Sequence, residues 1–302
     1  MTLRHRGWRL IGFLIVLRIF LGGVPASAGE ALPVFVSILP QKYFVEQVGG
    51  GHVAVSVMVA PGASPAIYEP KPRQMAALAA AKAYFAVGVP FEAAWLPRIQ
   101  AANPQMRVVD TAAEIVKRPM AAHAHEGDAD HDHHHDAGPH GALDPHVWLS
   151  PPLVKIQARA IRDALVALDP IHQADYDAGL GRFAQQIDDL GRELRETFAG
   201  REGMGFMVFH PSWGYFADAY GLEQIPIEIE GKDPKPAQLQ ELIETARSRD
   251  IRVIFVQPQF SGQSAAAVAA AIGGAVLPAD PLAPDWADNL RRQAAQIRGA
   301  LR

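Results

Sequence analysis

The sequence predicts an α/β protein in which two Rossmann-like lobes are joined by one long, rigid linker helix. In both halves of the chain, short apolar runs with β-branched residues alternate with helical segments, a pattern typical of parallel sheets covered by helices. Between the halves, apolar residues recur at steps of three and four, as on one face of an amphipathic helix. This apolar face comprises Tyr176, Leu180, Phe183, Ile187, Leu190, Leu194 and Phe198.

The first half is expected to contain four strands and three helices. Strands are predicted at 34–39, 53–59, 84–87 and 107–110, and helices at 41–48, 73–81 and 91–101. The first helix is expected to end at the glycines of 49–51, because glycine favours the backbone that terminates a helix. The 73–81 helix is rich in Ala, Leu and Met, which have high helix propensity.

Residues 117–145 interrupt this alternation. The segment is rich in Pro, Gly, Asp and His and holds almost no large apolar side chains. Because such a composition buries too little to order a chain, a disordered loop is predicted. Regular structure is expected to resume at 146–149 and in a helix after Pro151 and Pro152.

The second half repeats the strand–helix alternation. Strands are predicted at 206–209, 224–229, 252–256 and 275–277, and helices at 212–220, 236–249, 263–272 and 285–300. The expected organisation is an N-terminal lobe at 29–168, the linker helix at 169–200 and a C-terminal lobe at 201–302.

Residues 1–28 have the pattern of a signal peptide. A basic start with Arg4, Arg6 and Arg9 precedes an apolar run, and small residues follow up to Ala28. The run is shorter than the roughly 20 residues that span a bilayer as a helix, which disfavours a membrane anchor. We therefore expect export to the periplasm, with cleavage near Ala28.

Composition narrows the class of function. Four of the 28 basic residues and no acidic residue lie in 1–28, which leaves 24 basic against 32 acidic residues after cleavage. This acidic balance disfavours nucleic-acid binding and suits a protein that handles cations. The chain has no cysteine, so disulfides are excluded and a bound metal must be held by His, Asp or Glu.

The predicted loop concentrates candidate metal ligands. Seven of the 12 histidines lie in it, interleaved with acidic residues. Imidazole and carboxylate together suit borderline metals such as Zn²⁺, so an auxiliary metal-binding role is expected, the alternative being a solvated polar linker. The histidines are His123, His125, His131, His133, His134, His135 and His140.

Three further residues stand alone, each after an apolar strand or in a proline-bounded turn: His146, His210 and Asp280. Ligands of open α/β sheets bind beyond the carboxyl ends of the strands, so these side chains are candidates to converge on Zn²⁺ in one cleft. The alternative is structural. A lone His near a strand end is commonly a hydrogen-bonded residue, and Asp280 before Pro281 is placed to cap a turn.

Five short motifs follow one another along the chain. They are residues 61–70 (PGASPAIYEP), 144–151 (DPHVWLSP), 210–216 (HPSWGYF), 230–236 (EGKDPKP) and 280–282 (DPL). In this order, and with the His-rich loop between the first two, they resemble the zinc/manganese solute-binding proteins of ABC importers. The resemblance covers about residues 33–301.

The resemblance implies a periplasmic, non-enzymatic, monomeric subunit that captures Zn²⁺ between two α/β lobes and delivers it to an ABC permease and its ATPase. His146, His210 and Asp280 match the family's second, third and fourth metal ligands. Manganese members typically carry Glu where this chain has His210, so Zn²⁺ is favoured over Mn²⁺.

The first ligand of the resembled family, a His, is replaced by Ala66. Three substitutes remain open: Glu69 turned inward, a histidine of the loop, or water. Loss of high affinity, or a different substrate, is a fourth outcome. Tyr68 is expected to pack or hydrogen-bond, because a neutral phenol is a poor zinc ligand.

Two further groups near the motifs have expected roles. Trp148 and Trp213 are expected to form dry walls that orient the two histidines. The second group is a charged segment, which is interpreted as a solvated surface or, alternatively, as a contact to the permease. It comprises Glu228, Glu230, Lys232 and Asp233.

Two other functions compete with import. A periplasmic zinc buffer or chaperone would act through the His-rich loop. A zinc hydrolase would use three protein ligands and a water, as catalytic zinc does. The HExxH signature is missing from the sequence, however, and Glu69 is the sole candidate base.

Overall fold

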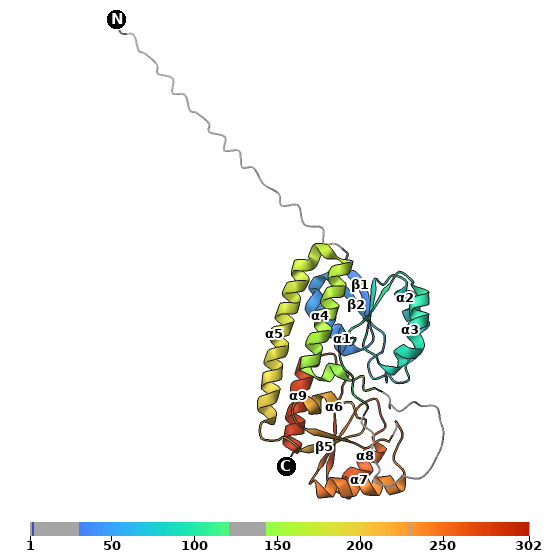
Figure 1. Ribbon diagram of the computed structural model, residues 1–302, viewed down its shortest axis with the longest axis vertical. Coiled ribbons are helices and arrows are strands. Elements are labelled where there is room, and N and C mark those ends of the chain that lie inside the picture. The colour runs from blue at the N-terminus through green and yellow to red at the C-terminus, as the bar shows by residue number, and fades with distance from the viewer. Residues whose placement is uncertain (1, 3–29, 121–142, 230, 302) are drawn as a thin grey trace. The chain divides into compact units, whose positions relative to one another are not determined.

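The structure, a computed structural model, describes residues 2, 30–120, 143–229 and 231–301. The chain divides into a unit of residues 1–30 and a compact unit of residues 31–302. The second unit holds every strand and helix of the described residues, arranged as two α/β lobes (Figure 1).

The N-terminal lobe is built on a four-stranded parallel sheet in the order β2-β1-β3-β4. The strands are β1 (Leu32–Val36), β2 (Val53–Val57), β3 (Ala83–Ala86) and β4 (Arg107–Asp110). Helices α1 (Leu39–Gly49), α2 (Pro72–Leu78) and α3 (Pro90–Ala102) connect them, and a 3-10 turn, Gly50–His52, follows α1. Because all pairings are parallel, the carboxyl ends of the strands meet at one edge of the sheet.

The C-terminal lobe repeats this design with the order β6-β5-β7-β8, again all parallel. Its strands are β5 (Gly205–Val208), β6 (Glu223–Pro226), β7 (Val253–Val256) and β8 (Ala275–Pro278). Its helices are α6 (Gly214–Ala219), α7 (Pro236–Ser248), α8 (Gln263–Ala271) and α9 (Trp286–Ala300). The predicted fold class, two α/β lobes with parallel sheets, is confirmed.

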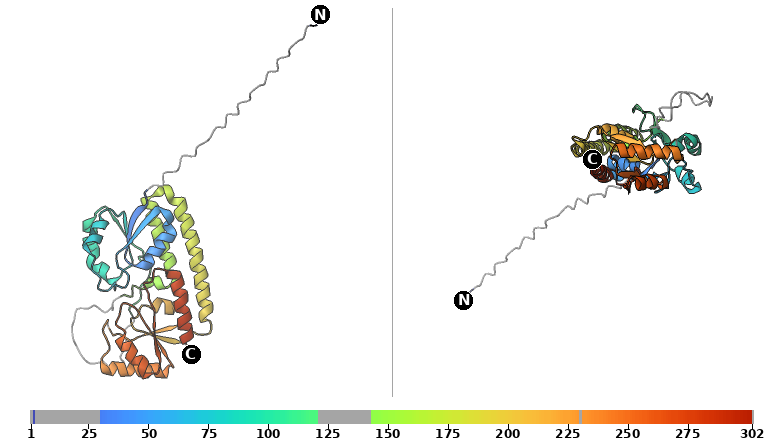
Figure 2. Two further views of the ribbon diagram at one scale, coloured as in Figure 1. Left: turned by 180° about the vertical axis from the view of Figure 1, so that it is seen from behind. Right: turned by 90° about the horizontal axis from the view of Figure 1, so that it is seen from below.

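Two long helices run beside the sheets. Helix α4 (Pro151–Leu168) is followed by a 3-10 turn (Pro170–His172) and by α5 (Gln173–Phe198), which packs along α4 (Figures 1 and 2). Every residue of the predicted apolar face of α5 is buried except Leu180, which is half-buried. Gly179 permits the close packing of α5 on α1, since an added Cβ would lie 2.3 Å from the Val48 carbonyl oxygen.

The first turn of α9 ties the C-terminal lobe to the N-terminal one. The ring of Trp286 is fully buried and meets Phe44 of α1 edge-on, with ring centroids 5.1 Å apart. Its Nε1 donates a hydrogen bond to the carbonyl oxygen of Trp148, at 2.7 Å. In the opposite direction, Trp148 Nε1 donates to the carbonyl oxygen of Pro281, at 2.8 Å. The two indoles therefore fasten the lobes together close to the segments that carry the candidate ligands.

Several predicted strands end earlier than expected. The first ends at Val36, because Leu39 and Pro40 already open α1, and the strand predicted at 224–229 ends at Pro226. Beyond it, the Ile227 nitrogen donates to the carbonyl oxygens of Val208 and Phe209, and the Glu228 nitrogen donates to that of Phe209, where β5 has already ended.

The prediction of disorder for 117–145 is wrong at both ends of the segment. Pro119 and Leu143 form an antiparallel bridge, and the side chain of Asp144 is fully buried. Polar residues order these ends through hydrogen bonds, which a prediction based on apolar burial misses. Residues 121–142 lie outside the described residues. Within the described part of the chain, no helix is long and apolar enough to cross a membrane.

Candidate metal centre

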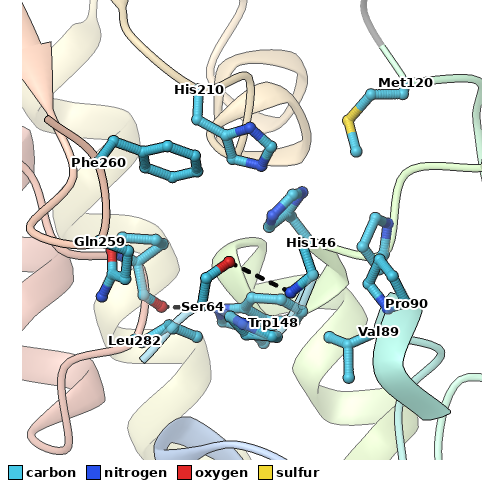
Figure 3. A pocket seen from close by; sticks show the side chains of 14 residues that line it. Ser64, Val89, Pro90, Met120, His146, Trp148, His210, Gln259, Phe260 and Leu282 are labelled. Carbon is cyan, nitrogen blue, oxygen red and sulfur yellow. Dashed lines mark hydrogen bonds between the residues drawn. The ribbon is translucent and has the colours of Figure 1, made fainter. Parts of the chain in front are cut away.

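A pocket between the lobes gathers segments that follow strand ends in both sheets (Figure 3). The N-terminal lobe supplies the loop after β2, the start of α3 and the segment around His146. The C-terminal lobe supplies the segments after β5, β7 and β8. The lining residues are Ser64, Pro65, Ala66, Val89, Pro90, Met120, Pro145, His146, Trp148, His210, Gln259, Phe260, Pro281 and Leu282.

His146 is held by the buried carboxylate of Asp144. The histidine immediately precedes the 3-10 turn Val147–Leu149, and Asp144 Oδ1 lies 2.7 Å from its Nδ1 and 3.0 Å from its backbone nitrogen. The other carboxylate oxygen accepts a hydrogen bond from Arg118 Nε, at 3.2 Å. Because a carboxylate only accepts, the ring donates through Nδ1 and presents Nε2 as its free lone pair.

Burial keeps His146 in the form that a metal needs. Removal from solvent lowers the pKa of its imidazole below the ordinary 6.5, although hydrogen bonding and attraction to Asp144 act in the opposite direction. Neutral imidazole is the metal-binding form, so the ring is available for coordination at neutral pH.

His210 has an equivalent support in the C-terminal lobe. It follows β5, and its Nδ1 lies 2.7 Å from Oε1 of Glu228, a residue that is only 6% exposed. Gln257, directly after β7, fixes the backbone of His210 from both sides. Its Oε1 accepts from the His210 nitrogen at 3.1 Å, and its Nε2 donates to the His210 oxygen at 2.6 Å. Two neighbouring strand ends thus fix the position of one imidazole.

The two imidazoles face each other across the pocket. Their ring centroids are 5.2 Å apart with planes at 70°. Phe260 stacks on His210 with centroids 4.9 Å apart, and Trp148 lies 5.1 Å from His146 (Figure 3). Aromatic walls of this kind exclude water and restrict ring rotation. Each lobe therefore contributes one imidazole to the pocket, and a carboxylate holds the Nδ1 of each.

Asp280 does not join the two histidines in this pocket. Its Oδ1 accepts hydrogen bonds from the Leu282 nitrogen at 2.9 Å and from Gln259 Nε2 at 3.1 Å, as in the turn-capping alternative. It lines an adjoining cavity, and Leu282 lines both. In the described part of the chain, no three His, Asp or Glu side chains are grouped so as to hold one metal ion.

The loop after β2 places Ala66 in the pocket and leaves Glu69 exposed outside it. Tyr68 is buried, as expected, and its hydroxyl donates to Gln74 Oε1 at 2.8 Å. The seven histidines predicted as auxiliary ligands all lie in 121–142, outside the described residues. The prediction that one of them replaces the missing imidazole therefore stays a prediction.

Two interpretations of the sequence are corrected here. Trp213 is no wall of the site: it is fully buried and packs edge-on against Phe216. Phe260 is the aromatic wall beside His210, and no pattern in the sequence pointed to it. Glu228 does not belong to a solvated surface, because it is buried against His210. The apolar neighbours Ile227 and Ile229 were the available signal, since they make the segment a poor surface.

A two-lobed α/β fold with a pair of carboxylate-held imidazoles in its interlobe pocket is that of a metal-handling solute-binding protein. Residues 34–300 match the family described as "Zinc-uptake complex component A periplasmic". The chain belongs to this family, the solute-binding proteins of zinc/manganese ABC importers. It is a family of metal-transport proteins, not of enzymes.

Individual relatives agree with this assignment. A crystal structure of ZnuA is similar at 42% sequence identity and a TM-score of 0.82, covering 90% of this chain and 99% of that one. A zinc-bound deletion mutant of ZnuA is similar at 42% identity and a TM-score of 0.81, covering 90% and 98%. The "High-affinity zinc uptake system protein ZnuA" of Bacillus subtilis (strain 168) is 28% identical over 83% of this chain and 78% of its own length. Family membership supports Zn²⁺ as the ion that this chain binds.

Proposed function

We propose that this chain captures Zn²⁺ in the pocket between its lobes and delivers the ion to an ABC permease and its ATPase. The observation that supports this most is the pair of imidazoles, one from each lobe, with centroids 5.2 Å apart. Both are oriented through Nδ1 by a buried carboxylate, which also raises the basicity of the metal-binding nitrogen. His146 and His210 are thus the central ligands of the proposal.

Asp280 is the proposed third protein ligand. It is half-buried, and its cavity shares one lining residue, Leu282, with the histidine pocket. To reach the ion, the Asp280 carboxylate has to give up its hydrogen bond from Gln259. The metal cation then takes the place of the uncharged amide as its partner. Glu69 remains a weaker candidate, because its loop would have to turn an exposed side chain inward.

The export signal, the loop and the lobe boundaries complete the proposal. Cleavage near Ala28 releases a monomeric periplasmic chain. Its lobes occupy 29–168 and 201–302, with the linker helix at 169–200. The seven loop histidines, His123 to His140, supply weak auxiliary zinc sites that load the pocket. Their affinity is expected to be lower than that of the pocket.

Calorimetric titration of the chain from residue 29 onward tests the capture step. We expect one tight Zn²⁺ site that is lost in both His146→Ala and His210→Ala. The matched control is His172→Ala, which removes a part-exposed imidazole paired with Asp169 at the turn before α5. Equal tight binding by the control and both site variants would place the zinc elsewhere.

Delivery needs a separate assay, because a buffer protein would pass the titration. Uptake of labelled zinc is measured in the native host after deletion of the chain and after complementation. The intact chain is expected to restore uptake at low external zinc, whereas His210→Ala is not. Full restoration by His210→Ala would contradict delivery from this pocket.

A further inference from the structure

On the side of the N-terminal lobe, the pocket is lined by a residue that cannot bind a metal, Ala66. Ala66 lines it together with His146 and His210, so the three positions surround one space. A methyl group coordinates nothing. Zn²⁺ in proteins favours four ligands, and the described residues bring only two imidazoles together in this pocket. Even with Asp280 recruited, these residues would supply three ligands, one fewer than the four that Zn²⁺ favours.

The walls of that space are apolar or uncharged. Val89, Pro90 and Met120 contribute from one side, and Phe260 and Leu282 from the other (Figure 3). Among the described residues that line the pocket, none is Asp, Glu, Lys or Arg. Such a lining favours a small group with apolar faces and one donor atom, and disfavours a charged group, which would lose its hydration without gaining a partner.

Two polar side chains at the edge of the space each make one hydrogen bond within the protein. Ser64 Oγ accepts a hydrogen bond from the Ala66 nitrogen at 3.3 Å, and Gln259 Nε2 donates to Asp280. Phe260 and Trp148, which contact His210 and His146, also line the pocket, so a flat ring that enters it would meet aromatic as well as aliphatic side chains.

We propose that the Ala66 site takes up Zn²⁺ together with a small heteroaromatic nitrogen base of the imidazole type. The nitrogen of that base completes the coordination sphere, and its ring fills the space beside the Ala66 methyl group. The step is a ligand exchange in which a zinc-bound water leaves. The inference rests on the proposed function, because it requires His146 and His210 as ligands. The substrate of the site is then a zinc complex rather than the bare ion.

Zinc titrations with added imidazole test this in a non-coordinating buffer. The apparent affinity of the intact chain is expected to rise at least about tenfold, the scale on which groups around a metal site act. Pyrrole is the matched control, since it has the same ring shape without a basic nitrogen, and it should have no effect. L-histidine, compared at equal free Zn²⁺, should enhance binding less than imidazole, because its charged amino-acid group meets the uncharged lining.

Ala66→His is the complementary variant. It is expected to bind Zn²⁺ tightly without imidazole and to be insensitive to it. With Co²⁺ as the probe, imidazole should strengthen the visible absorption typical of four-coordination in the intact chain and leave that of Ala66→His unchanged.

The outcomes separate the two proposals. If the intact chain already binds Zn²⁺ tightly, loses it in His210→Ala and does not respond to imidazole, capture stands and the co-ligand is refuted. The co-ligand is likewise refuted if imidazole acts equally on Ala66→His. If neither the intact chain with imidazole nor Ala66→His binds Zn²⁺, both the co-ligand proposal and the capture proposal are refuted.

Discussion

The carboxylate behind His210 offers a sharp test of how the site works. Glu228→Gln keeps the length of the side chain and an oxygen that accepts from Nδ1, but removes a negative charge 2.7 Å from the ring. Neutral acceptors form weaker hydrogen bonds than charged ones, so the imidazole becomes less basic and less firmly oriented. Loss of such a partner typically costs about 10–100-fold in metal affinity. Because Gln has nearly the same shape as Glu, we expect a loss of zinc affinity at the lower end of this range, about tenfold or ~1.4 kcal/mol.

The assay is calorimetric zinc titration at neutral pH, with thermal unfolding recorded for each variant. Glu46→Gln is the matched control, since it neutralises an exposed glutamate on α1 that pairs with Lys42. The control should keep the affinity of the intact chain. An unchanged affinity in a well-folded Glu228→Gln chain would refute the reasoning that the carboxylate tunes the ligand.

Three further results are expected. Asp280→Asn should lower zinc affinity without unfolding the chain, whereas a purely turn-capping Asp280 would leave titrations unaltered and affect only thermal unfolding. Zinc affinity should fall between about pH 8 and pH 5, because protons compete for imidazole. Burial lowers the pKa of His146, so its own share of that loss should appear only below the ordinary 6.5, and a loss complete above that value would contradict the assignment. Trp286→Ala should destabilise the chain by about 3–5 kcal/mol in chemical denaturation, as for other buried aromatic truncations, and a loss under about 1 kcal/mol would show that the indole does not tie the lobes.

The fold could be predicted almost completely because its signals are periodic and local. The apolar stripe that begins at Tyr176 predicts α5, and strand–helix alternation predicts both parallel sheets. The ends of strands were predicted less accurately. Where the backbone stays hydrogen-bonded past the end of a strand, as at Ile227 and Glu228, apolar patterning does not show where the strand ends.

The site could be predicted only in part. Sequence context identified His146 and His210, and the structure brings them to one pocket. Sequence context could not reveal that Glu228 holds His210, since a contact across 18 residues depends on the tertiary fold. The same limit hid Phe260, which reaches His210 from the loop after β7.

The central claim is that zinc is captured by the pocket and not by the His-rich segment. Pro119 and Leu143 are bridged, so residues 121–142 can be replaced by a short Gly–Ser linker without separating the flanking chain. Zinc titration of this shortened chain, with and without His210→Ala, is the most direct test. We predict one tight site in the shortened chain that His210→Ala abolishes. Loss of tight binding on shortening alone would contradict the account and make the His-rich segment the functional zinc site.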